Sequence, residues 1–173
     1  MLKFDANLSF LFNEVDFLVR FEKAANAGFK GVEYPFPEGY QAEQLSELLA
    51  KHHQEQVLFN LPSGKTGERG IACLPGREAE FQEGVGRAVT LAKALRCTRI
   101  NCLVGNTPAG VSADILRRTL IGNLHFAAAA FQKEGVRLLV EALNGLDMPG
   151  FYLLRSADAF DLIKEVNHPN LYF

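Results

Sequence analysis

Short apolar runs alternate with amphipathic stretches along the whole chain, and this alternation limits the possible folds more than any other feature. The runs are LKF near residue 3, GVEY at 31, QVLFNL at 56, RINCLV at 99, VRLLVEAL at 136 and NLYF at 170. They are continuously apolar, which is typical of strands buried on both faces of a parallel sheet. The pattern predicts an α/β fold in which strands and helices alternate.

Five helices are predicted between the runs, from apolar residues at three- and four-residue spacing. Their expected ranges are 14–27, 42–53 and about 78–95, followed by one helix after the N-cap residue Ser112 and one capped by Ser156. Gly28 is a natural residue to end the first helix. No linker marks a second domain, so we expect residues 1–173 to form a single domain.

Two architectures fit this order of elements, an open doubly wound sheet and a β/α barrel, and periodicity alone does not separate them. In both, ligands meet the carboxyl ends of the strands and the loops that follow. That rule selects these candidate positions: Asn7, Glu33, Asn60, 105–110, Glu141 and Asn144.

Charge and cysteine usage exclude several classes of function. Eighteen Lys and Arg balance twenty Asp and Glu, for a net charge of −2, and the basic residues are scattered, so no nucleic-acid or membrane partner is indicated. The amino-terminal region is interrupted by Asp5, Asn7 and Asn13, which argues against a signal peptide or membrane span and for a cytoplasmic protein. The three cysteines form no CxxC pair and are expected to be reduced thiols packed as small hydrophobes.

The string Ser63-Gly64-Lys65-Thr66 imitates the end of a phosphate-binding P-loop. A P-loop also needs a glycine five positions before its second glycine and a helix directly after the Ser/Thr. Here Phe59 stands at the glycine position, and GERGIACLPG follows where the helix would begin. We therefore expect no nucleotide site, but a long loop that either covers a site or is a floppy insertion.

Glu141 is the residue most suggestive of chemistry, because it follows the apolar run RLLV at the end of a predicted central strand. A carboxylate buried there must bind a metal, pair with a base or shift its pKa; otherwise it reaches solvent. Glu33 is interpreted instead as a structural hydrogen-bond partner. None of the four histidines has zinc-site spacing, and GxSxG is absent.

Six strings together resemble the hydroxypyruvate isomerase family, which includes 2-oxo-tetronate isomerases. They are ANLSFLF at 6, GFKGVEYPFP at 28, FNLPSG at 59, GERGIACLPGRE at 67, INCLVGNTPAG at 100 and VEALN at 140. The resemblance implies a (β/α)8 TIM barrel of the xylose-isomerase-like type. It also implies interconversion of hydroxypyruvate and 2-hydroxy-3-oxopropanoate (tartronate semialdehyde), within glyoxylate and carbohydrate metabolism. The alternative activity is that of a 2-oxo-tetronate isomerase or another ketose/aldose-type isomerase of the same barrel family.

The same resemblance implies a cofactor and site residues. A divalent metal ion, Mg²⁺ or Mn²⁺, is expected, with Glu141 both as metal ligand and as proton donor or acceptor. The expected substrate-binding residues are Asn7, Asn60, Lys65, Arg69, Arg77 and Asn144. For the three basic residues, a solvated loop charge is the alternative.

A complete eight-stranded barrel needs about 250 residues. We therefore expect this chain to hold the first five βα units and the start of strand six. The family resemblance implies that the remaining metal ligands and a second catalytic Glu lie beyond Phe173. The 173 residues alone are expected to be inactive and prone to associate, including as a homo-oligomer. The alternative of another class is a truncated, non-catalytic chain that acts only through association with another chain.

Overall fold

The computed structural model describes residues 2–173 and contains a six-stranded parallel sheet whose strands follow one another in chain order. The strands are β1 (Ala6–Asn7), β2 (Gly31–Tyr34), β3 (Glu55–Asn60), β4 (Arg99–Cys102), β5 (Arg137–Val140) and β6 (Leu171–Tyr172). The helices between them are α1 (Phe17–Asn26), α2 (Ala42–His52), α3 (Glu78–Leu95), α4 (Ala113–Gln132) and α5 (Ser156–Val166). A doubly wound sheet would reverse its strand order at a switch point, so this order confirms five βα units of a barrel.

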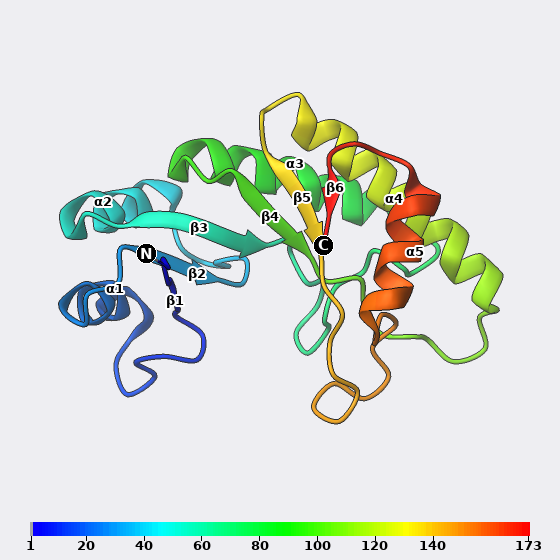
Figure 1. Ribbon diagram of the computed structural model, residues 1–173, viewed down its shortest axis with the longest axis horizontal. Coiled ribbons are helices and arrows are strands. Elements are labelled where there is room, and N and C mark those ends of the chain that lie inside the picture. The colour runs from blue at the N-terminus through cyan, green and yellow to red at the C-terminus, as the bar shows by residue number, and fades with distance from the viewer. Residues whose placement is uncertain (1) are drawn as a thin grey trace.

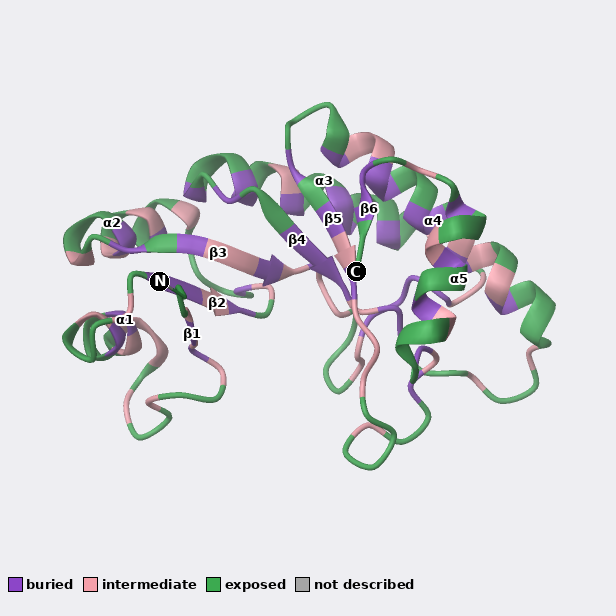
Figure 2. Cartoon of the chain, in the orientation of Figure 1, coloured by how far each residue is buried: buried purple, intermediate pink, exposed green. Residues whose placement is uncertain are grey.

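The sheet curves as an open arc, with α2, α3 and α4 along its outer side (Figure 1). Outward-facing strand residues such as Val32, Phe59, Ile100 and Leu138 are fully buried against the helices. Figure 2 shows buried residues gathered between the sheet and the helical layer. Burying each such side chain contributes about 1.5–3 kcal/mol, so this layer holds the arc together.

Local signals in the sequence explain where the helices begin and end. Gly28, with φ of +95°, follows the C-cap of α1, and its N–H donates to the Ala25 carbonyl at 2.9 Å. Ser112 caps α4 as predicted, since its Oγ accepts the Ile115 N–H at 3.4 Å. The prediction for Ser156 was wrong by one residue, because Arg155 is the N-cap and Ser156 is the first residue of α5. None of the helices among residues 2–173 is long and apolar enough to cross a membrane.

The first strand was predicted at LKF, and that placement was wrong. Leu2 and Phe4 are 82 % and 72 % exposed, whereas Ala6 is fully buried and pairs with Val32. Ala6 and Asn7 are the residues that pair with β2, opposite Val32 and Glu33. Asn7 is consequently the last residue of β1, not a residue after it.

All three cysteines are free and buried, as the sequence predicted. Burial raises the pKa of the Cys73 and Cys97 thiols to about 11, and it raises the pKa of Cys102 further still. A thiol with so high a pKa is a poor nucleophile and metal ligand at neutral pH, so these side chains act as small apolar groups in the core.

Candidate active site

Five polar side chains mark the carboxyl ends of the first five strands, on the face of the sheet that points away from the helices. We call them the polar row: Asn7, Glu33, Asn60, Asn101 and Glu141. In the sheet register Asn7 lies beside Glu33, and Asn60 lies beside Asn101. Their sequence neighbours Ala6, Val32, Phe59, Ile100 and Val140 are buried under the helices, so alternation along the strands turns the polar row inward.

Asn101 links two other members of the polar row. Its Nδ2 donates to Asn60 Oδ1 at 3.1 Å and to Glu141 Oε1 at 2.6 Å. Asn101 is 4 % exposed, while Glu141 is half-buried one residue after β5. The Glu141 carboxylate is therefore held by a buried amide and still reaches the open side of the sheet.

The other end of the polar row is a second hydrogen-bonded pair. Asn7 Nδ2 donates to Glu33 Oε1 at 2.8 Å, which confirms the interpretation of Glu33 as a hydrogen-bond partner. Burial raises the pKa of the Glu33 carboxyl, and the negative charges of Asp5 and Glu141 raise it further, against the opposing effect of Asn7. Glu33 and Glu141 thus lie close enough across the row to repel each other.

The polar row offers chemistry that suits a hard cation. Mg²⁺ and similar ions are commonly held by one or two carboxylates, with waters and substrate oxygens completing the coordination. Glu141 supplies such a carboxylate, and its hydrogen bond from Asn101 leaves the second oxygen for a ligand. Residues 2–173 contain no cluster of three acidic, His or Cys side chains fit for a metal. The described chain therefore contributes one evident ligand, and the metal ion stays a prediction.

The loop between β3 and α3, residues 61–77, is fixed to the rest of the structure, which excludes a floppy insertion for its second half. Residues 70–73 are buried. The Cys73 N–H donates to the Val104 carbonyl at 2.8 Å, and Asn123 Nδ2 donates to the Ala72 carbonyl at 2.9 Å. Because α3 begins only at Glu78, no helix N-terminus follows Thr66, and the P-loop interpretation is excluded here as the sequence predicted.

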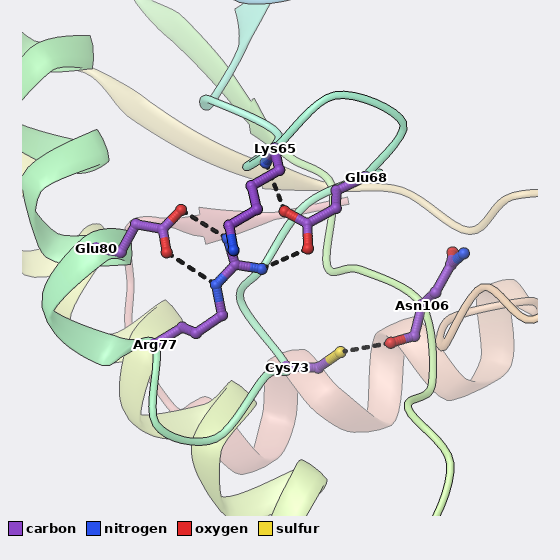
Figure 3. A network of polar contacts seen from close by, with 6 residues as sticks. All are labelled: Lys65, Glu68, Cys73, Arg77, Glu80 and Asn106. Carbon is purple, nitrogen blue, oxygen red and sulfur yellow. Dashed lines mark hydrogen bonds and ion pairs between the residues drawn. The ribbon is translucent and has the colours of Figure 1, made fainter.

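The predicted substrate-binding residues of this loop lie in two settings. Lys65 and Arg69 belong to its outer part, with Lys65 exposed and Arg69 half-buried. Arg77 lies at the base of the loop between Glu68 and Glu80, with ion-pair distances of 2.6 Å to each (Figure 3). These two hydrogen-bonded carboxylates raise the pKa of the Arg77 guanidinium. Arg77 thus closes the loop onto α3, and its predicted contact with substrate stays a prediction.

Asn144 organises the turn that follows Glu141. Its Oδ1 accepts the N–H groups of Leu146 at 2.8 Å and Asp147 at 3.3 Å, and its Nδ2 donates to the Asp147 carboxylate. In this structure the Asn144 side chain holds its own loop, and its role as a substrate ligand stays a prediction.

Asn101 was not predicted from the sequence, although a signal was present. It is the one strongly polar residue within the run INCLV. Like Asn60 and Glu141, it lies within one residue of the end of its strand. What the sequence lacked was the register that puts these three side chains next to one another.

Comparison with known proteins gives a consistent family. The family model described as xylose isomerase-like TIM barrel matches residues 21–173. The chain is 52 % identical over 173 residues to hydroxypyruvate isomerase of Escherichia coli (strain K12), covering 99 % of this chain and 67 % of that protein. It is 43 % identical to 2-oxo-tetronate isomerase of Cupriavidus necator, covering 99 % of this chain and 66 % of the relative. The chain thus spans about two thirds of the length of the curated relatives it matches.

Solved structures agree on the fold. A crystal structure titled AP endonuclease, family 2, from Brucella melitensis superposes with a TM-score of 0.95 at 43 % identity, covering 99 % of this chain and 67 % of that one. An L-ribulose 3-epimerase superposes with a TM-score of 0.77 at 16 % identity, covering 99 % of this chain and 59 % of that one. The second likeness shows the shared barrel architecture alone.

Proposed function

We propose an isomerase function on the premise that this chain belongs to the xylose isomerase-like TIM barrel family. The substrate pair that we propose is hydroxypyruvate and 2-hydroxy-3-oxopropanoate, supported by the 52 % identity to a hydroxypyruvate isomerase. A 2-oxo-tetronate is the alternative substrate, supported by the 43 % identity to a 2-oxo-tetronate isomerase. The observation that carries the proposal is the Glu141 carboxylate, held by Asn101 at the carboxyl end of the sheet.

The reaction moves a carbonyl group to the neighbouring carbon. A base removes a proton from C3 of hydroxypyruvate, which gives an enediolate spanning C2 and C3. A proton is then returned to C2, and the C3 hydroxyl proton moves to the C2 oxygen, so C3 becomes the aldehyde and no atom is gained or lost. A carboxylate within hydrogen-bonding reach of the substrate can make such transfers, and we assign Glu141 this role.

A divalent cation such as Mg²⁺ or Mn²⁺, when bound, holds the substrate oxygens and stabilises the negative charge of the enediolate. Glu141 is the residue of this chain that would hold it. Asn101 donates to Oε1 of that carboxylate, and no hydrogen bond from the described residues occupies the second oxygen. We place the remaining ligands in the part of the barrel outside these 173 residues.

The substrate itself carries a carboxylate. We propose that the cationic loop residues Lys65 and Arg69 bind this group, because neither has an ion-pair partner among the described residues. Asn7 and Asn60, which belong to the polar row, would bind substrate hydroxyl or carbonyl oxygens. A cytoplasmic location and a role in glyoxylate metabolism follow as parts of the same proposal.

The test uses the complete natural protein, with turnover measured on hydroxypyruvate, on a 2-oxo-tetronate and on DNA containing abasic sites. The DNA is included because the Brucella melitensis structure is titled an endonuclease. We expect Mg²⁺- or Mn²⁺-dependent turnover of a hydroxy-oxo acid, and a loss of at least about 100-fold in Glu141→Gln. Activity on DNA alone, or wild-type turnover in Glu141→Gln, would refute the proposal.

The 173-residue chain is tested separately. We expect it to be inactive alone, because one evident ligand does not fix a hard cation. Native mass spectrometry decides the alternative of a non-catalytic chain: a stable natural species of 19.1 kDa that turns over no substrate would favour it.

A further inference from the structure

Asn101 is the only residue of the described chain seen to hydrogen-bond the Glu141 side chain. It lies in β4 between Asn60 at the end of β3 and Glu141 after β5. We propose that Asn101 is a positioning residue that sets the orientation of the Glu141 carboxylate, and through it the divalent-metal affinity of the site. This inference rests on the proposed function.

The hydrogen-bond geometry is demanding. An amide NH₂ group has two hydrogens in one plane, and here one is directed at Asn60 Oδ1 at 3.1 Å and the other at Glu141 Oε1 at 2.6 Å. Both hydrogens are thereby used, which fixes the rotation of the amide about its terminal bond. The shorter contact is a charge-assisted bond to a carboxylate, which is the stronger kind.

The backbone also holds Asn101 in place. In the sheet, Asn101 pairs with Asn60 of β3 on one side and with Leu139 of β5 on the other. Its backbone carbonyl accepts the Leu61 N–H at 2.8 Å. The residue is 4 % exposed, so its hydrogen bonds are shielded from water. Because the Asn101 amide is buried and its backbone is held on both sides, it restricts the orientations that the Glu141 carboxylate can adopt.

Partners of this kind orient metal ligands, and their loss commonly lowers metal affinity or activity about 10- to 100-fold. Asn101→Leu keeps the approximate size of the side chain and removes its donors. We expect this variant of the complete protein to bind Mn²⁺ about 10-fold more weakly, measured by electron paramagnetic resonance of free Mn²⁺. We also expect kcat to fall about 10-fold or more, with KM changed less than about three-fold.

Asn170 provides a matched control. It too is a buried asparagine, 8 % exposed, whose Nδ2 donates to two acceptors, the carbonyls of Ala128 at 3.1 Å and Val136 at 2.8 Å. Asn170→Leu removes the same chemical group outside the polar row. It should lose stability to a similar degree and keep the Mn²⁺ affinity and kcat of the natural protein.

A coupling measurement separates positioning from general damage. On a Glu141→Gln background, Asn101→Leu should change Mn²⁺ affinity by less than about two-fold, because the carboxylate it orients is already gone. Equal losses on both backgrounds would overturn the inference, as would Mn²⁺ affinity in Asn101→Leu within two-fold of the natural protein. If Asn101→Leu does not fold, Asn101→Ser is measured against the same expectations.

The outcomes for the two proposals are distinguishable. Absence of turnover on every hydroxy-oxo acid by the natural protein refutes the proposed function, whereas the Mn²⁺ measurements still decide the role of Asn101. Turnover by the natural protein together with an unaffected Asn101→Leu variant refutes only the inference about Asn101.

Discussion

A Cβ atom on Gly70 would lie 1.7 Å from the carbonyl oxygen of Leu103, so the loop after β3 touches the backbone that follows β4 with no room for a side chain. Gly70 also has a φ of +96°, a conformation that other residues rarely adopt. The contact is between two backbones, and neither can rotate away as a side chain could. The loops above the carboxyl ends of β3 and β4 are thus packed as one unit.

Gly70→Ala should destabilise the protein by about 2 kcal/mol or more, through backbone strain and the clash with Leu103. Urea unfolding measures the change. Gly86→Ala is the control, because Gly86 lies in α3 with no heavy atom near its missing Cβ and should gain about 0.5–1 kcal/mol. A Gly70→Ala variant as stable as the natural protein would contradict the packing described above.

Arg77→Ala should weaken the structure modestly and leave substrate binding unchanged. Arg77 is engaged by Glu68 and Glu80 at 2.6 Å each, and partly exposed ion pairs of this kind are worth up to about 1 kcal/mol. We therefore expect a loss of about 0.5–1 kcal/mol in unfolding free energy and an unchanged KM. Arg69→Ala is the comparison, and we expect its KM to rise several-fold. A raised KM in Arg77→Ala would instead support its original assignment to the substrate.

The pairing of His168 with His125 predicts a fall in stability with acidification. Burial and the neighbouring His125 ring, 5.2 Å away, lower the pKa of His168, whose Nδ1 accepts the Asn170 N–H at 3.1 Å. Below the unfolded pKa of about 6.5 the unfolded chain binds more protons at this position than the folded chain, so stability decreases as pH falls from about 7 toward the lowered pKa.

Thermal unfolding of the natural protein and of His168→Gln between about pH 7.5 and 5.5 checks this. The difference in stability between the two should shrink as pH falls, because the glutamine side chain cannot take up a proton. Comparing the two proteins also cancels the carboxyl groups that titrate in the same range. A stability difference that does not change with pH would show that folding does not lower the pKa of His168.

The sequence predicted the elements that depend on local signals and failed where spatial neighbours decide. The range of α3 and the cap of α4 were correct, because apolar spacing and the Ser112 hydroxyl act within a few residues. The first strand was misplaced, because LKF is apolar but only Ala6 and Asn7 have partners in β2. Barrel and open sheet share the same βα spacing, so the family resemblance, not periodicity, separated them.

The candidate site was partly predictable for the same reason. Glu141 was identified because a carboxylate after four apolar residues is unusual on its own. Asn101 became evident only when the register of β3, β4 and β5 brought it between Asn60 and Glu141. Arg77 was predicted to bind substrate from its charge; the structure adds its ion pairs with Glu68 and Glu80, and the contact with substrate stays a prediction.

Glu33→Gln should stabilise the protein at about pH 8 more than at about pH 5. Burial, with the charges of Asp5 and Glu141, raises the pKa of Glu33, so the folded chain holds a proton there more firmly than the unfolded chain does. The natural protein therefore loses stability as pH rises through the raised pKa of Glu33. At lower pH, where Glu33 is protonated, that loss is absent. Glutamine keeps the shape and can still accept the bond from Asn7, without the buried charge.

Urea unfolding of both proteins at about pH 5 and about pH 8 measures the difference. Glu38→Gln is the control, since Glu38 is an exposed carboxylate that pairs with Arg87. That substitution removes a charge that is exposed to solvent and not buried. It should therefore be neutral or slightly destabilising at the higher pH. If Glu33→Gln destabilises the protein equally at both pH values, then the Asn7–Glu33 bond, and not the relief of a buried charge, dominates the energetics at this end of the polar row.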